Sequence, residues 1–270
     1  MILSNIADMK FPCVSGFYGL DSAANLQKEL ALQPEDWYYR NKEITYTLNS
    51  QGYRAPEWED VDWENSIVFM GGSQIFGVGN DDSDTIPNMV TILTGTPTVN
   101  LSLGGVGMQF HRQNTKMLCD NNIKPKKVFL IATPKYRFTW MKERYPGELS
   151  FENFGSWLLK NDKRDPTYSS REPKTSYAKL RKEIFTYWID FDYQVDSEYK
   201  HCIDHIQLMW EKAGVPVELF AENSEDCELL GLEDFDLEAY NFGRCEKARD
   251  NSHGDRNFNR RVAEIFKEYV

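Results

Sequence analysis

Four short apolar runs along the chain each predict a β-strand. The first, Ile67–Met70, is apolar throughout and stops at a glycine, which is typical of a strand buried on both faces. The other runs cover residues 98–103, 127–132 and 215–220. We expect these strands to form the buried centre of the molecule.

The segments between and after these runs show helical periodicity. Apolar residues recur at helical spacing over 86–93, where Pro87 suits the first turn of a helix. A polar helix is predicted over 108–121, and the 3.6-residue period over 256–269 predicts an amphipathic helix that closes the domain. Strands that alternate with helices are typical of parallel βαβ units, so the pattern predicts a three-layer α/β/α sandwich.

Two segments depart from this alternation. Residues 1–65 are rich in aromatic and acidic side chains without a clear period, and we interpret them as an irregular N-terminal arm that wraps the domain. Residues 138–200 form an aromatic-rich insertion, expected to be helical towards its end and able to cover the carboxyl edge of the sheet. The chain shows no repeat or low-complexity tract, so we predict a single domain over 1–270.

Composition narrows the class of protein. The formal net charge is −11 at pH 7, which argues against a nucleic-acid backbone or an anionic membrane as the main partner. Five scattered cysteines without a C-x-x-C pair indicate reduced thiols rather than a disulfide framework. The N-terminus lacks the pattern of a secretory signal, and no apolar run approaches the ~20 residues of a membrane helix. We therefore expect a soluble, cytoplasmic protein, and a place in a virion or a particle released by lysis is also compatible.

A glycine-rich turn directly follows the first predicted strand and contains Gly71, Gly72 and Ser73. Ligands of open parallel sheets bind beyond the carboxyl ends of the strands, and glycines there let a substrate approach backbone N–H groups. The same turn also suits a serine that merely caps a helix. A phosphate-binding loop is disfavoured, because the turn has neither the P-loop lysine nor a G-x-G-x-x-G pattern.

Two further motifs add chemistry to this turn. Asp250 precedes His253 by three residues, a spacing that lets the carboxylate hold one imidazole nitrogen while the other faces a serine. On its own, the same motif also describes a solvated loop histidine. A second glycine loop, residues 104–107, follows the second predicted strand and is able to place a backbone N–H beside the serine, or is simply a tight turn.

Together these motifs resemble the SGNH (GDSL-type) hydrolase family. The resemblance runs through "LNSQGYRAPE", "IVFMGGSQIFGVGNDDSDTIPNMV", "VNLSLGGVG" and "DNSHGDRNFNRRVAEIF", and covers roughly residues 45–135 and 245–270. It implies a flavodoxin-like parallel sheet with Ser73 as nucleophile, His253 as general base and then acid, and Asp250 orienting the imidazole. It also implies an oxyanion hole formed by the N–H groups of Ser73 and Gly105, with no metal and no cofactor.

The sequence departs from the family pattern in two places. Gly72 stands where the family has an aspartate before the serine. The asparagine that the family places after the third strand is missing, since that strand runs into Thr-Pro-Lys-Tyr-Arg at 133–137. Lys135 or Arg137 is a candidate for the missing oxyanion donor or for a substrate contact, and loss of one donor typically costs about 10²–10³ in rate. His111, which follows the second glycine loop, is a further candidate for a substrate contact, although a place on the surface of a helix is the simpler interpretation.

The resulting hypothesis is a serine esterase or deacylase that acts on a small-molecule or carbohydrate ester. Aromatic side chains of the 138–200 insertion could stack on sugar rings, which would suit removal of O-acetyl groups, although aromatics commonly build core. Two alternatives remain open: an SGNH-like binding or structural protein with impaired catalysis, and an O-acyltransferase that uses the same residues. A zinc site at His201 and His205 is disfavoured, because the glutamate of H-E-x-x-H and a third ligand are both missing. The oligomeric state is left open.

Overall fold

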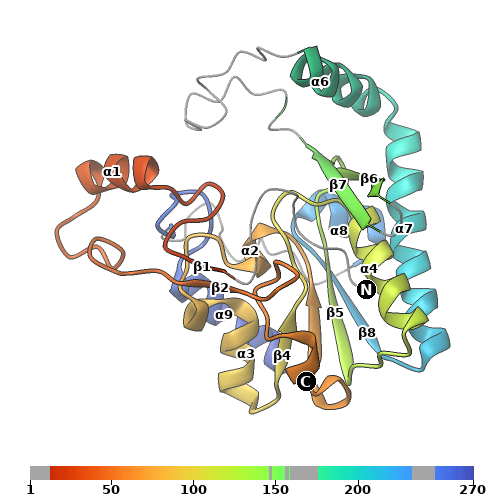
Figure 1. Cartoon of the computed structure of the whole chain (residues 1–270), viewed down its shortest axis with the longest axis horizontal. Helices are drawn as coiled ribbons and strands as arrows, with labels where there is room; N and C mark the ends of the chain where they lie inside the picture. Colours follow the sequence, from red (N-terminus) through yellow and green to blue (C-terminus); the bar gives the residue numbers. More distant parts are fainter. Residues whose placement is uncertain (1–12, 146–147, 156–157, 159–175, 233–246) are drawn as a thin grey trace.

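A four-stranded parallel sheet forms the centre of the computed structural model, which describes residues 13–145, 148–155, 158, 176–232 and 247–270 (Figure 1). The strand order across the sheet is β4-β3-β5-β8. These strands are β3 (Ile67–Met70), β4 (Thr98–Asn100), β5 (Lys127–Ala132) and β8 (Val217–Ala221). All four runs predicted as strands therefore lie in this sheet, and β4 is shorter than predicted because its regular pairing stops at Asn100.

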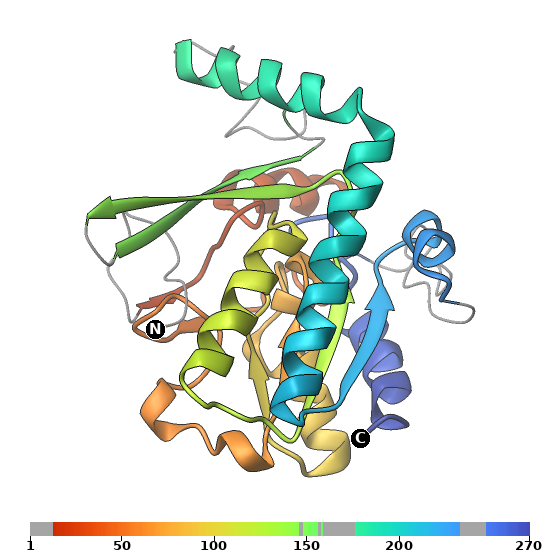
Figure 2. The same cartoon turned by 90° about the vertical axis from the view of Figure 1, so that its right-hand side faces the viewer.

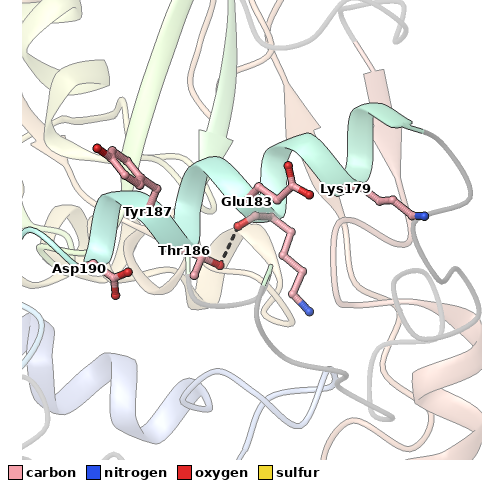
Figure 3. Close-up of a pocket in the computed structure, with 6 residues that line it drawn as sticks. Lys179, Glu183, Thr186, Tyr187 and Asp190 are labelled. Atoms are coloured by element: carbon pink, nitrogen blue, oxygen red, sulfur yellow. Dashed lines mark hydrogen bonds between the residues drawn. The ribbon is translucent and has the colours of Figure 1, made fainter.

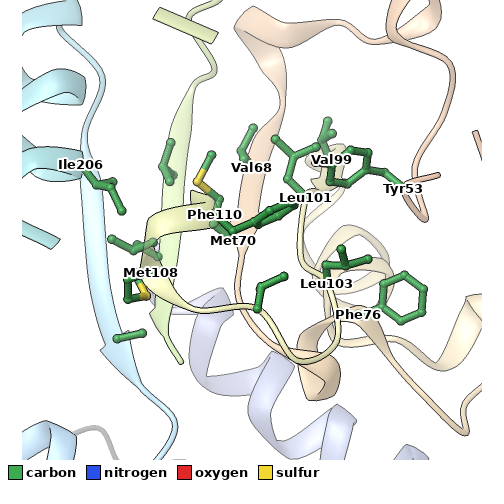
Figure 4. Close-up of a cluster of buried hydrophobic side chains, with 14 of the residues drawn as sticks. Tyr53, Val68, Met70, Phe76, Val99, Leu101, Leu103, Met108, Phe110 and Ile206 are labelled. Atoms are coloured by element: carbon green, nitrogen blue, oxygen red, sulfur yellow. The ribbon is translucent and has the colours of Figure 1, made fainter. Parts of the chain in front are cut away.

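Helices cover both faces of the sheet, so the molecule has three layers (Figure 2). One face carries α4 (Met108–Asp120) and α7 (Asp192–Ala213), and the other carries α3 (Ile86–Thr94) and α9 (Arg256–Lys267). Neighbouring residues of β3 point to opposite faces, as they do in any strand. Val68 and Met70 enter the α4–α7 cluster shown in Figure 4, whereas Ile67 and Phe69 enter the α3–α9 cluster. This alternation explains why β3 is apolar at every position.

The helix ends follow from the local sequence. Thr85 caps α3 by accepting from the Asn88 N–H, and Asp255 caps α9 by accepting from the Phe258 N–H. Asn223 caps the short helix α8 (Ser224–Leu230) in the same way. Within the described part of the chain, no helix is both long and apolar enough to cross a membrane.

The N-terminal segment is more regular than the sequence pattern predicts. Strand β1 (Cys13–Ser15) pairs antiparallel with β2 (Tyr46–Leu48), and α1 (Ala23–Leu32) lies between them in the chain. The segment also contributes to the main core through five buried side chains: Tyr39, Ile44, Tyr46, Leu48 and Tyr53. The part of the expected arm over residues 1–12 lies outside the described residues.

The 138–200 segment begins with a β-hairpin that the sequence pattern did not predict. Strands β6 (Phe138–Tyr145) and β7 (Glu148–Phe154) pair antiparallel, and α6 (Ser176–Ile189) follows. Phe138, Phe154 and Phe185 form a small separate cluster that joins the hairpin to α6. The last residues of the segment, from Asp192 onward, begin α7, which continues to Ala213 and packs on the sheet as part of the sandwich (Figure 1).

Candidate active site

Ser73 lies at the carboxyl edge of the sheet, two glycines beyond the end of β3. It is the first residue of α2 (Ser73–Phe76), a single helical turn. The neighbours of β3 are β4 on one side and β5 on the other, so the chain reverses its direction across the sheet at this strand. Such a switch point is where open α/β sheets bind their ligands.

His253 and Asp250 meet Ser73 although 180 residues separate the serine from the histidine. The imidazole Nε2 of His253 lies 2.7 Å from the Ser73 Oγ, and its Nδ1 lies 2.5 Å from Oδ2 of Asp250. With Nδ1–H donating to the carboxylate, Nε2 is left to accept from the serine hydroxyl. The Asp250 side chain is fully buried and Ser73 is partly exposed, so the arrangement opens to solvent at the serine.

The Asp250 carboxylate is stabilised in its charged form despite complete burial. Burial alone would raise the pKa of this carboxyl, but the His253 charge and hydrogen bond oppose that effect. The backbone N–H groups of Ser252 and His253 also donate to Asp250 Oδ1, each at 3.2 Å. The net result is a pKa below the ordinary value for an aspartate, which leaves Asp250 ionised at neutral pH.

Three amide side chains hold the His253 loop against α2. Gln74, the neighbour of Ser73, accepts from the Gly254 N–H at 2.8 Å and donates to Asn259 Oδ1 at 2.6 Å. Asn80 donates to the Gly254 carbonyl at 3.0 Å. No sequence motif marks Asn80 or Asn259, and the only signal for Gln74 is its position beside Ser73. None of the three was therefore predicted.

The N-terminal segment also contributes to the position of this loop. Arg249, which precedes Asp250, forms two hydrogen bonds to the Asp21 carboxylate, with N···O distances of 2.8 and 2.6 Å. Tyr46 donates to the same carboxylate at 2.6 Å and accepts from the Gly79 N–H at 2.7 Å. The Gly79 carbonyl in turn accepts from the Arg249 N–H at 3.2 Å. A closed polar network therefore connects Asp21 and Tyr46 to Arg249, the residue before Asp250.

Replacing Arg249 with methionine is expected to destabilise the protein by about 3–5 kcal/mol, because it leaves the Asp21 carboxylate buried without its charged partner. Urea unfolding followed by circular dichroism measures this loss. The double variant Arg249→Met with Asp21→Leu is expected to recover much of it, since no buried charge remains. A loss below about 1 kcal/mol in the single variant would contradict a structural role for this ion pair.

The second glycine loop lies against Ser73 and offers backbone donors. After β4 ends, the N–H groups of Leu101 and Leu103 still bond to the carbonyls of Phe69 and Gly71, at 2.8 and 3.1 Å. A Cβ on Gly104 would lie 3.6 Å from the Ser73 Cβ, and Gly105 has a φ of +76°, which favours glycine. Within the described residues, no hydrogen bond occupies the N–H of Ser73 or of Gly105. Both are available to an anion.

The structure separates the two basic candidates of the 133–137 loop. The Lys135 ammonium forms ion pairs with Asp196 and Glu225, at 3.0 and 2.8 Å. The Arg137 guanidinium instead lies beside the nucleophile turn, since a Cβ atom added to Gly72 would lie 3.2 Å from its Nη1. Arg137 also forms an ion pair with Glu222 at 3.5 Å. Glu222 follows β8 and carries no motif, so the sequence offered no signal for it.

His111 lies inside the core rather than on a helix surface or in contact with solvent at the site. Its ring is completely buried and packs edge-on against Phe110, with the two ring centroids 5.4 Å apart. Burial lowers the pKa of His111 to about 3. Few residues of 108–121 are apolar, and Asn114 and Thr115 share the buried face of α4, so the sequence did not reveal that His111 faces the sheet. His111 has no exposed surface with which to contact a substrate.

In the unfolded chain His111 can bind a proton, whereas in the native protein it stays neutral. The free energy of unfolding is therefore expected to fall as pH drops below about 6.5. One such proton contributes about 1.4 kcal/mol per pH unit, so about 2 kcal/mol is expected to be lost by pH 5. His111→Leu should remove this part of the decline. Urea midpoints at pH 7 and pH 5 measure the effect, with the exposed residue His205→Gln as the control. An unchanged pH dependence in His111→Leu would contradict a buried, neutral imidazole.

The remaining features are not part of the hydrogen-bonded group around Ser73. His201 and His205 are both exposed on α7, and the described residues contain no group of three side chains suited to a metal ion. Two hollows of about 480 and 470 Å³ lie along α6, and Figure 3 shows the first. The first is lined by polar and charged residues around Glu183 and Tyr187, and the second by Trp140 and Trp188 among others.

No protein-family model matches this chain, and no curated protein matches it either. Only the geometry of the site itself therefore indicates a function. Its main elements are a hydrogen-bonded serine, histidine and aspartate, two available backbone donors, and an arginine next to the nucleophile turn.

Proposed function

We propose that this protein is a serine esterase or deacylase of the SGNH type. The observation that carries the proposal is the continuous hydrogen-bonded path from Ser73 through His253 to Asp250, with distances of 2.7 and 2.5 Å. The strand order supports it as well: numbered along the chain, the four parallel strands follow 2-1-3-4, the beginning of the flavodoxin-like order. The site at the carboxyl end of the first of these strands agrees with the resemblance to SGNH hydrolases.

The first half of the reaction acylates the serine. His253 Nε2 takes the Ser73 proton as Oγ attacks the ester carbonyl carbon, and the carbonyl electron pair moves onto oxygen. The N–H groups of Ser73 and Gly105 donate to this oxyanion. As the tetrahedral intermediate collapses, the bond to the leaving oxygen breaks, and that oxygen takes the proton from His253. Asp250 stabilises the imidazolium in between and keeps the ring in the required tautomer.

The second half returns the serine by hydrolysis. A water molecule gives a proton to His253 Nε2 and attacks the acyl carbon, which forms a second oxyanion in the same position. Collapse breaks the bond to Ser73 Oγ, which takes the proton back from His253, and the carboxylic acid leaves. The charged Asp250 is needed in both halves, which agrees with its lowered pKa.

A carbohydrate ester is the substrate class that the surface supports best. Trp140 and Tyr187 are 52% and 69% exposed, and both line the second hollow beside β6 and α6. Two exposed aromatic side chains that line the same hollow suit stacking against a ligand ring. Because β6 begins directly after the 133–137 loop, this hollow belongs to the same segment as Arg137.

The test is product analysis on two substrates, p-nitrophenyl acetate and acetylated xylo-oligosaccharides. Wild type is expected to release acetate from both, and Ser73→Ala from neither. If added sugar acceptor diverts the acetyl group from water to the acceptor, the reaction is acyl transfer through the same residues. If neither wild type nor Ser73→Ala hydrolyses any substrate of a wider ester panel, the hydrolase proposal is wrong and the binding or structural role is favoured.

A further inference from the structure

We propose that Arg137 is the third donor to the oxyanion and that Glu222 holds it beside the nucleophile. This inference rests on the proposed esterase function and names the group that completes its oxyanion hole. It follows from where the two ends of Arg137 lie: the backbone end contacts the glycine loop, and the side-chain end contacts the nucleophile turn. Arg137 would thereby donate to the oxyanion in place of the asparagine that the resemblance leads one to expect.

The backbone end of Arg137 is fixed to the second glycine loop. A Cβ on Gly107 would lie only 2.5 Å from the Arg137 carbonyl oxygen, so the two backbones are in close contact. The Gly107 N–H donates to Thr139 Oγ1 at 2.9 Å, and the Thr139 N–H donates to Gln109 Oε1 at 3.2 Å. The start of β6 and the loop that contains Gly105 are thus bonded together. Movement of Arg137 relative to this loop is restricted.

The side-chain end reaches the residue next to the nucleophile. A Cβ atom added to Gly72 would lie 3.2 Å from Nη1 of Arg137 and 2.2 Å from Oε1 of Glu222. The Glu222 carboxylate therefore fills the space that a side chain at position 72 would need. This explains why glycine occurs at a position where the resemblance leads one to expect aspartate. The guanidinium and carboxylate together take over that volume.

The Arg137 guanidinium, with Glu222 beside it, is chemically suited to donate to an oxyanion as negative charge develops. A guanidinium carries five N–H donors, and among the described residues only Nη1 of the Arg137 guanidinium forms a hydrogen bond, a long contact of 3.5 Å to Glu222, so further donors of the guanidinium remain for a ligand. The Arg137 side chain is 23% exposed, which keeps it accessible to a bound ester. Lys135, the other basic side chain in this loop, already forms two ion pairs. Arg137 is accordingly the cation suited to the role.

Arg137→Ala is expected to lower kcat for p-nitrophenyl acetate about 10²–10³-fold with little change in KM, because an oxyanion donor acts mainly in the transition state. Added guanidinium chloride should restore part of the rate in this variant, and sodium chloride at the same concentration should not. The charge-matched control is Arg260→Ala, an exposed residue on α9. If Arg137→Ala does not fold, Arg137→Gln, which keeps most of the side-chain volume, replaces it.

Glu222 is a positioning residue in this account, and a double-mutant cycle tests that role. Glu222→Ala should lower kcat less than Arg137→Ala, and combining both should be no worse than Arg137→Ala alone, because residues that act as a unit are not additive. Fully additive effects would overturn the positioning role.

The outcomes separate this inference from the proposed function. If wild type hydrolyses esters and depends on Ser73, yet kcat of Arg137→Ala stays within about threefold, Arg137 is not an oxyanion donor and only the further inference fails. Failure of guanidinium to restore any rate would also overturn it. Inertness of wild type itself would instead remove the esterase proposal, and the further inference would fail with it.

Discussion

Ser73→Ala is expected to lower kcat for ester hydrolysis by about 10⁶-fold, the size of loss seen when the nucleophile of a serine–histidine unit is removed. The reason is that no other hydroxyl stands 2.7 Å from His253 Nε2 among the described residues. KM should change little, since the serine hydroxyl contributes little to ground-state binding. The measurement is steady-state hydrolysis of p-nitrophenyl acetate, with the unfolding midpoint recorded to show that the fold is intact.

The matched control for this variant is Ser83→Ala. Ser83 is an exposed serine that hydrogen-bonds to Asp81 and lies outside the proposed site. Its kcat should equal that of wild type. Ser73→Ala with more than about 1% of wild-type kcat would contradict the role of Ser73 as nucleophile, because the residual activity expected from the oxyanion hole and binding alone is far smaller.

Asp250→Asn is expected to lower kcat about 10⁴-fold with no gross change in geometry. An asparagine amide can donate to His253 Nδ1, which would move the proton to Nε2 and leave that nitrogen unable to accept from Ser73. The variant also removes the negative charge that stabilises the imidazolium. Because the Asp250 pKa is lowered by its partners, wild type gains stability from this carboxylate at neutral pH and loses it as pH falls through that pKa.

Asp204→Asn provides the control, since Asp204 is exposed on α7. Its kcat should be indistinguishable from wild type. The kcat of Asp250→Asn is best compared at neutral pH, where wild-type Asp250 is ionised. A drop of less than about tenfold would show that Asp250 does not control the tautomer and charge of His253.

The parts of the fold that depend on local pattern could be predicted from the sequence. A continuously apolar run such as Ile67–Met70 has few alternatives to a strand buried on both faces, and it became the sheet strand β3. Part of the candidate site follows from the same reasoning, whereas the place of Asp250 and His253 beside Ser73 was implied by the resemblance to SGNH hydrolases. Residues placed just beyond the carboxyl ends of parallel strands share one edge, so the Ser73 turn and the 104–107 loop were expected to meet there.

Other parts could not be predicted, because they depend on contacts between distant segments. Gln74 bonds to Asn259, 185 residues away, and no pattern in either segment indicates the partner. The β6–β7 hairpin packs its own small aromatic cluster and carries many charged residues, so its period-2 pattern is weak. His111 was misplaced for a related reason: α4 has too few apolar positions to reveal which face it buries.

The most direct test of the central claim is labelling with a fluorophosphonate followed by peptide mapping. We expect one covalent adduct per chain, located on Ser73, which does not form in Ser73→Ala and forms much more slowly in His253→Ala. No adduct on wild type, or an adduct that forms equally fast without His253, would contradict an activated serine at this sheet edge.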